Sequence, residues 1–194
     1  MTPQVETATA AHEAAVYDTL MLAFASDPMA RWTWPDAHVY LEVFPRFAKA
    51  FGGAGFALGT AHRIGNEAAA LWLPPGVEPD SEAMDRLMQG SLSAEVAADV
   101  VQIMEQMTSF HPQEEHWYLP MIGADPAHQG KGLGSALLKH ALAICDRDGV
   151  AAYLESSNPR NIPLYERHGF VRLGSIQAGS SPVVTPMLRK AKRR

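Results

Sequence analysis

Cysteine is nearly absent from this chain of 194 residues, because Cys145 is its one representative. A single cysteine cannot form an internal disulfide, so the composition excludes a disulfide-stapled secreted fold and favours a reducing compartment. The eight histidines show no spacing typical of metal ligands. We therefore expect no metal site.

An excess of positive charge and a long apolar run are also missing. Lys and Arg total 16 against 21 Asp and Glu, a formal net charge of −5, which argues against a nucleic acid partner. No apolar run reaches the roughly 20 residues that a membrane helix needs, and the first residues lack a signal-peptide pattern. We expect a cytoplasmic protein that does not act at a membrane, built as one domain over residues 1–194.

The most informative stretch runs from Trp117 to Gly149 and combines a strand, a glycine-rich turn and an amphipathic helix. Residues 117–122 are apolar and aromatic, as in a central strand, and Pro120 predicts a bulge because proline cannot donate to the ladder. One buried helix face is predicted by apolar residues at helical spacing, namely Leu133, Leu137, Leu138, Ala141, Leu142 and Cys145.

Between this strand and helix, Gly130, Gly132 and Gly134 stand at alternate positions. Glycine lets the backbone approach a ligand closely, and the first turn of the following helix offers free N–H groups to phosphate oxygens. The loop is not a nucleotide P-loop, because Lys131 is followed by Gly132 and not by a hydroxyl residue. The glycines fit just the first half of a dinucleotide fingerprint.

The rest of the chain alternates strands and helices, which predicts an α/β fold with helices on both faces of a mixed sheet. Expected strands lie at residues 4–7, 56–62, 68–73, 151–155, 170–173 and 183–188, and expected helices at 11–25, 38–51 and 161–168. Pro45 should kink or split the second helix, and residues 29–36 are expected to form an aromatic loop. Two methionine-rich helices, split at residues 89–91, should fill residues 80–110.

Residues 129–134 resemble the pyrophosphate loop of the GNAT superfamily of N-acetyltransferases, Q/R-x-x-G-x-G/A, with Gln129, Gly132 and Gly134 at the fixed positions. The run from Asn158 to Phe170 resembles a second family signature, N-x₆-Y-E-x-x-G-F. The segments A-F-x-x-D-P at 23–28 and A-x-W-L-P-P-G at 70–76 resemble a GNAT group that includes puromycin acetyltransferase-like enzymes.

This resemblance implies the GNAT acyl-CoA N-acyltransferase fold, whose mixed central sheet is splayed between its fourth and fifth strands. The helical insertion at about residues 80–110 then precedes the fourth strand. Acetyl-CoA is the implied co-substrate, with the pantetheine and carbonyl near Ile122, Gly123 and Ala124. The other implied cofactor-binding residues are Gln129, Gly130, Lys131, Gly132, Leu133, Gly134, Asn158 and Asn161.

Acyl transfer to an amine needs a neutral amine, a polarised thioester carbonyl and a stabilised thiolate. The resemblance makes Tyr165 the candidate general acid toward the thiolate. Glu155 and His116, at strand ends, are candidate bases. Ordinary roles compete with each assignment, because Tyr165 can be a packed aromatic, the two asparagines can cap a helix, and strand-end charges are often solvated.

The sequence therefore predicts an acetyl-CoA-dependent N-acetyltransferase acting on the primary amine of a small molecule, as a monomer or homodimer. An enzyme for protein or peptide amines and a non-catalytic acyl-CoA-binding protein are the alternatives. We expect the methionine-rich helices to cover the acceptor pocket together with Trp32 and Trp34, since methionine adapts to irregular apolar shapes.

Overall fold

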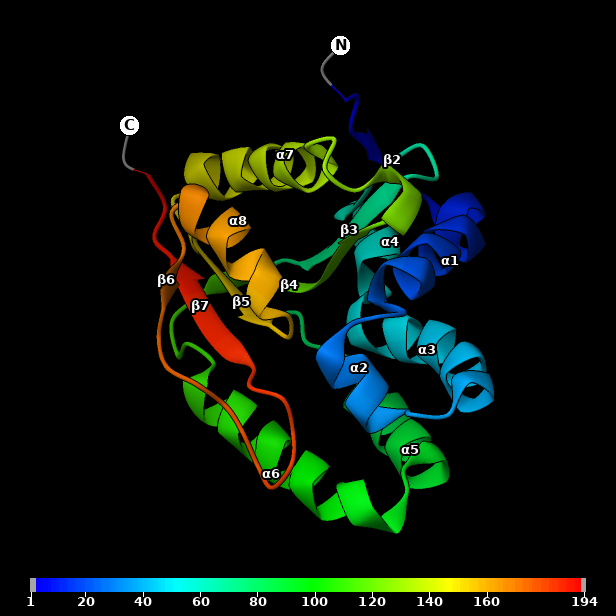
Figure 1. Cartoon of the computed structure of the whole chain (residues 1–194). Helices are drawn as coiled ribbons and strands as arrows, with labels where there is room; N and C mark the ends of the chain where they lie inside the picture. The colour runs from blue at the N-terminus through cyan, green and yellow to red at the C-terminus, as the bar shows by residue number, and fades with distance from the viewer. Residues whose placement is uncertain (1–2, 193–194) are drawn as a thin grey trace.

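A seven-stranded mixed sheet forms the centre of the computed structural model, which describes residues 3–192 (Figure 1). Neighbouring strands in the order β1-β2-β3-β4-β5-β7-β6 are antiparallel, apart from the parallel pair β4 and β5. The strands are β1 Glu6–Thr7, β2 Ala61–Ile64, β3 Ala68–Leu73, β4 His116–Ala124, β5 Ala151–Ser156, β6 Val171–Arg172 and β7 Thr185–Arg189.

Helices cover both faces of this sheet, as the sequence predicted (Figure 1). They are α1 Glu13–Phe24, α2 Pro28–Thr33, α3 Ala37–Gly52, α4 Ala54–Leu58, α5 Ser81–Ser91, α6 Ala94–Phe110, α7 Leu133–Asp148 and α8 Ile162–Arg167. Three short 3-10 turns, η1 Ala10–His12, η2 Pro126–His128 and η3 Pro159–Asn161, precede α1, the glycine loop and α8. The helices α5 and α6 form the expected insertion before β4.

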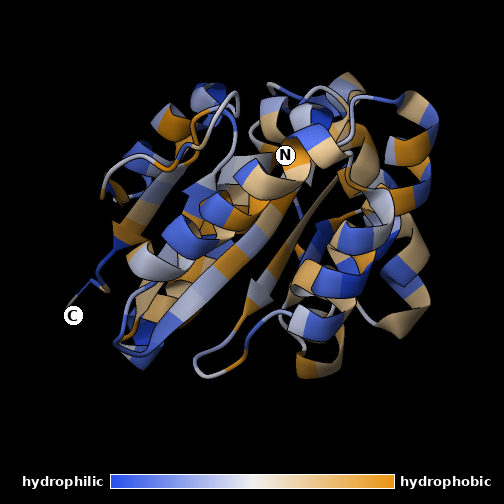
Figure 2. Cartoon of the chain, turned by 90° about the horizontal axis from the view of Figure 1, so that it is seen from below, coloured by the Kyte–Doolittle hydropathy of each residue, from blue (hydrophilic) through white to orange (hydrophobic). Residues whose placement is uncertain are grey.

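The two faces of β3 show how the layers are assigned. Ala68, Ala70 and Trp72 pack in one apolar cluster with residues of α7 and α8, whereas Ala69 and Leu71 pack with residues of α1 and α3. This alternation follows from the period of two in a strand, and every residue of β3 is buried because both faces are covered. Figure 2 shows blue and orange residues mixed along the helices, as expected for amphipathic elements packed on a sheet.

The predicted bulge lies in β4 at Pro120. Leu71 pairs with Met121 but Leu73 pairs with Tyr118, so β4 has one more residue than β3 across this step. The extra residue changes the face of the sheet to which the following side chains point. Leu119 packs on the α7 side, and Met121 packs on the α1 and α3 side. In a regular strand those two residues would share a face.

The sheet opens between β4 and β5, as the GNAT resemblance implied. These strands pair in register from His116 opposite Ala151 to Tyr118 opposite Tyr153. Beyond Tyr118, β4 continues to Ala124 and β5 to Ser156 without mutual pairing in the described register. Because Pro120 has no N–H to donate, the ladder ends where the bulge begins.

The expected strand at residues 56–62 is wrong in its first part, because α4 occupies Ala54–Leu58 and β2 starts at Ala61. Phe56 packs edge-on against Tyr17, with ring centroids 5.6 Å apart, and Gly59 ends the helix with a φ of 69°. A short apolar run such as this fits a buried helix as well as a strand.

The aromatic loop expected at residues 29–36 is also corrected, because α2 spans Pro28–Thr33. Asp27 is its N-cap, accepting from the N–H groups of Met29 and Ala30, and Pro28 occupies the first turn. Pro45 does not split α3, which runs from Ala37 to Gly52, and the break between α5 and α6 falls at residues 92–93.

Candidate active site

A cleft of about 450 Å³ lies where β4 separates from β5. We call it the loop cleft, and most of the cofactor-binding residues that the sequence predicted line it. They are Ile122, Gly123, Ala124, Gln129, Gly130, Gly132, Leu133, Gly134, Asn158 and Asn161, with Tyr165 beside them. Lys131 is exposed and is not among the residues that line this cleft.

The glycine loop leaves open space beside its backbone. Gly130 and Gly132 have φ values of 77° and 78°, which favour glycine, and a Cβ at either position would have no atom within 4 Å. Gly132 is the N-cap of α7, so the free N–H groups of the first helical turn face the cleft. The Gln129 side-chain amide donates to the Ala124 carbonyl at 3.3 Å and ties the loop to the end of β4. This cradle fits the phosphates of an acyl-CoA.

Two basic side chains that sequence reasoning missed also line the loop cleft. Arg160 lies in η3 and Arg167 is the last residue of α8, so both come from a segment that follows the glycine loop in the chain. Positive charges here add to the helix dipole in favouring phosphates. Their signal was present in the sequence, since both lie within the second family signature, at positions that the motif does not specify.

Tyr165 lies on the inner side of α8 and is 5% exposed. Its ring packs edge-on against Phe170, with centroids 6.1 Å apart, while the residue also lines the loop cleft. Burial raises its pKa above the ordinary value, and the nearby Asp27 carboxylate raises it further. The phenol therefore stays protonated at neutral pH and can donate a proton.

The two asparagines differ in their local roles. The Asn158 side chain caps η3 by accepting from the N–H of Arg160 at 3.1 Å, whereas Asn161 stands at the start of α8 and makes no side-chain cap there. Both line the loop cleft, so a capping role and a ligand contact are compatible at Asn158.

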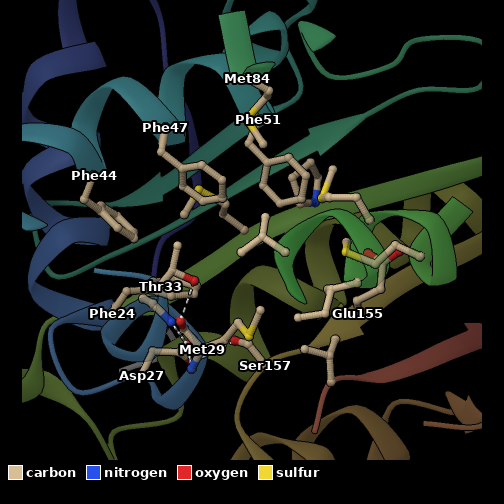
Figure 3. A pocket seen from close by; sticks show the side chains of 18 of the residues that line it. Phe24, Asp27, Met29, Thr33, Phe44, Phe47, Phe51, Met84, Glu155 and Ser157 are labelled. Carbon is tan, nitrogen blue, oxygen red and sulfur yellow. Dashed lines mark hydrogen bonds between the residues drawn. The ribbon is translucent and has the colours of Figure 1, made fainter. Parts of the chain in front are cut away.

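A second cavity, of about 130 Å³, lies on the other side of the splay and is lined mostly by apolar side chains. We call it the apolar cavity (Figure 3). Aromatic residues of α3 and methionines of the helical insertion form much of its wall, including Phe44, Phe47, Phe51, Met84, Met88 and Met104.

Glu155 lines this apolar cavity and not the loop cleft. Its Oε2 accepts a hydrogen bond from the Tyr118 hydroxyl at 2.8 Å. Burial raises the pKa of Glu155 to about 7, against the opposing effect of that hydrogen bond. His116, the other candidate base, lies away from both cavities, with its Nε2 3.3 Å from Nε2 of His111.

Asp27 and Phe24 line both cavities and mark the place where they meet. The Oδ1 atom of Asp27 caps α2, and Oδ2 accepts from the Ser157 hydroxyl at 2.7 Å. Burial raises the pKa of Asp27 despite these hydrogen bonds. Sequence reasoning missed this carboxylate, although an Asp-Pro pair before a helix is a recognisable N-cap signal.

Of the elements expected to cover an acceptor pocket, the methionine-rich helices and Trp34 line the apolar cavity, whereas Trp32 does not. Trp34 lines the apolar cavity, and its Nε1 donates to the Ser91 hydroxyl at 3.0 Å. Trp32 does not line it, because its Nε1 donates to Ser180 at 3.1 Å and its ring packs beside the cluster around Ile103.

Neither a metal site nor a membrane helix is found among residues 3–192. No group of three or more His, Cys, Asp or Glu side chains in this range is arranged to share a metal ion. Within the same range, no helix combines the length and apolar character that crossing a bilayer requires.

Sequence comparisons connect this site with acetyltransferases. The model of the acetyltransferase (GNAT) family matches residues 93–170. The chain is 43% identical over 65 residues to an uncharacterised N-acetyltransferase of Schizosaccharomyces pombe, covering 33% of this chain and 26% of that protein. It is 37% identical over 75 residues to the mycothiol acetyltransferase of Gordonia bronchialis, covering 35% and 24%. The matches thus span about a quarter of the length of these curated relatives.

Solved structures match over nearly the whole chain. A Corynebacterium glutamicum protein described as histone acetyltransferase HPA2 and related acetyltransferase has a TM-score of 0.70 and 28% identity, covering 100% of this chain and 99% of that one. An agmatine N-acetyltransferase mutant has a TM-score of 0.67 at 13% identity, covering 96% and 98%. A mosquito arylalkylamine N-acetyltransferase like 5b has a TM-score of 0.60 at 10% identity, covering 96% of this chain and 99% of that one. The last two share the fold alone.

Proposed function

We propose that this chain, in which residues 93–170 match the GNAT family model, is a GNAT N-acetyltransferase that transfers the acetyl group of acetyl-CoA to the primary amine of a small molecule. The observation that carries the proposal is the meeting of two unlike cavities at Asp27 and Phe24. One has a glycine loop and arginines suited to phosphates, and the other has an apolar wall with buried carboxylates suited to an amine.

The loop cleft is the proposed site for acetyl-CoA. Backbone groups of Ile122, Gly123 and Ala124 would hold the pantetheine, because β4 has left β5 there and its backbone is free of that partner. Residues 129–134 with Arg160 and Arg167 would hold the phosphates, Lys131 being a proposed contact from the rim, and Asn158 and Asn161 would contact the ligand from the α8 side. The acetyl thioester supplies the activated carbonyl.

Glu155 is the proposed general base and Tyr165 the proposed general acid. Glu155, ionised above its pKa of about 7, would accept a proton from the ammonium of the substrate so that the nitrogen can attack the carbonyl carbon. As the carbon–nitrogen bond forms, the carbon–sulfur bond breaks and the sulfur takes the proton of the Tyr165 hydroxyl. The newly bonded nitrogen then loses its second proton to solvent to give the neutral amide, and exchange with solvent returns a proton to Tyr165 and removes one from Glu155.

Two features favour a small-molecule acceptor over a protein amine. The helices α5 and α6 supply part of the wall of the apolar cavity, so these helices would obstruct a folded protein that approached the cavity from their side. The cavity's volume of about 130 Å³ suits a small body more than a polypeptide segment. The raised pKa of Glu155 favours an enzyme over a binding protein, because binding acyl-CoA needs no base.

A thiol-release assay with acetyl-CoA and a panel of small amines tests the proposal. We expect thiol release that depends on the small amine. Release with peptides alone would indicate a protein acetyltransferase. Binding of acetyl-CoA without any thiol release would indicate a non-catalytic protein. The site itself is tested by calorimetry on Gly132→Ala, which should lose acetyl-CoA affinity. Gly65→Ala is the matched control, because Gly65 also has a positive φ, of 51°, and open space but lies in the turn between β2 and β3.

A further inference from the structure

We propose that the apolar cavity selects primary monoamines with an apolar body about the size of one six-membered ring, and that it rejects polyamines. This inference rests on the proposed function, since it names the class of amine that the same site accepts. It is argued from the charges, the hydrogen bonds and the volume of the cavity.

The charged side chains that line the apolar cavity are two carboxylates, Asp27 and Glu155, and no Lys, Arg or His of the described residues lines it. A buried carboxylate is stabilised by a cation, so the occupant should carry an ammonium group beside these residues. The same group is the nucleophile of the proposed reaction, and Asp27 places it at the border with the loop cleft.

Away from Asp27 and Glu155, the cavity wall offers no side-chain oxygen to a second ammonium. The other side-chain oxygens that line the cavity are the hydroxyls of Thr33 and Ser157, and Figure 3 places both near Asp27. In Figure 3, Phe44, Phe47, Phe51 and Met84 lie on the side of the cavity away from Asp27 and Ser157. A polyamine reaching that side would bury a charge among aromatic rings and thioethers without a hydrogen bond.

The volume sets the size of the apolar body. An engineered protein cavity of about 150 Å³ binds one benzene molecule, and the apolar cavity measures about 130 Å³. Its aromatic wall is braced, because Phe47 stacks on Phe51 at 5.2 Å and meets Trp34 edge-on at 5.3 Å. Methionines elsewhere in the lining let the cavity fit rings and short alkyl chains of similar volume.

Matched amine pairs test the charge and the size separately. We expect kcat/KM for hexylamine to exceed that for 1,6-diaminohexane by at least about tenfold, because the pair differs by one terminal ammonium. The kcat/KM for benzylamine should likewise exceed that for 1-naphthylmethylamine, because the second ring adds volume. Equal or greater kcat/KM for the diamine, or for the two-ring amine in the wild-type protein, overturns the inference.

Cavity variants identify the place where the amine binds. Phe47→Ala removes a ring from the wall, so we expect the preference for benzylamine over 1-naphthylmethylamine to fall by about tenfold or more. Phe56→Ala is the matched control, because Phe56 is a buried phenylalanine that does not line the cavity. An unchanged preference in Phe47→Ala, or an equal change in both variants, overturns the inference.

Calorimetry in the presence of CoA separates this inference from the proposed function. Binding of hexylamine, with weaker binding of hexanol and 1,6-diaminohexane, supports the inference even when no amine releases thiol from acetyl-CoA; the proposed function then fails alone. Thiol release that favours the diamine leaves the function standing and overturns the inference. Absence of hexylamine binding together with absence of thiol release for every amine of the panel overturns both.

Discussion

The ionisation of Glu155 should control the pH dependence of turnover. The carboxylate must be charged to accept a proton from the amine, and its pKa of about 7 puts the midpoint of that charge near neutral pH. Below this value kcat/KM should fall about tenfold per pH unit because the fraction of carboxylate falls in that way. Glu155→Gln keeps the size of the side chain, removes the base and should lower kcat/KM by about 10²–10⁴.

Tyr118 gives this prediction a second, independent arm. Its hydroxyl donates to Glu155 at 2.8 Å and stabilises the charged form, so Tyr118→Phe should raise the pKa of Glu155. A hydrogen bond to a charged group is worth about 1.5–3 kcal/mol. At 1.36 kcal/mol per pKa unit, the acidic limb should therefore move upward by about one to two pH units.

Rates of thiol release between pH 5 and 9.5 measure the effect, with two amines whose own pKa values differ. An acidic limb caused by deprotonation of the amine shifts with the pKa of the amine used, whereas a limb caused by ionisation of Glu155 stays at the same pH for both amines. Tyr40→Phe is the matched control, because the buried Tyr40 hydroxyl donates to the Met21 carbonyl and Tyr40 lines neither cavity. A limb near pH 7 that persists in Glu155→Gln, or an unmoved limb in Tyr118→Phe, refutes the role of Glu155.

Three further predictions concern other residues. Tyr165→Phe should lower kcat by at least about 100-fold with little change in acetyl-CoA affinity by calorimetry, and more than a third of wild-type kcat would contradict the acid role. Asp27→Asn keeps a capping oxygen for α2 and should raise KM for the amine by about tenfold while the melting temperature changes little; an unchanged KM would argue against an ammonium contact. Arg189 is 3% exposed and its two hydrogen bonds to Asp146 hold the pKa of that carboxyl below 3.8, so this stabilisation is present above pH 3.8 and lost as pH falls through the lowered value. Arg189→Met should cost about 3 kcal/mol in urea unfolding at pH 7, and a difference from wild type that does not narrow at acid pH would contradict this account.

The parts of the site that the sequence predicted are those encoded in short contiguous stretches. The glycine loop and the segment that contains Tyr165 have fixed motif spacings. Pro120 alone was enough to predict the bulge at the opening of the sheet. The apolar cavity was predicted in outline, because the composition of residues 80–110 is unusual in methionine. These features depend on local chemistry that a single segment contains.

The parts that escaped prediction depend on contacts between distant segments. The Asp27 carboxylate meets a hydroxyl 130 residues away, and Glu155 meets a phenol 37 residues away, so neither environment has a local signature. Trp32 and Trp34 are close in sequence, but partners at Ser180 and Ser91 place them differently. The helix α4 was misread as strand because its five residues contain too few positions to reveal a period.

The shared wall at Phe24 and Asp27 has a consequence for inhibitor design. Since the loop cleft and the apolar cavity meet there, one molecule that joins CoA to an apolar monoamine through its sulfur would occupy both at once. Tethering makes the second contact intramolecular, so the affinity of such a compound should exceed that of either half by orders of magnitude, provided that its linker matches the span. The amine half would then distinguish this protein from relatives that share the glycine loop.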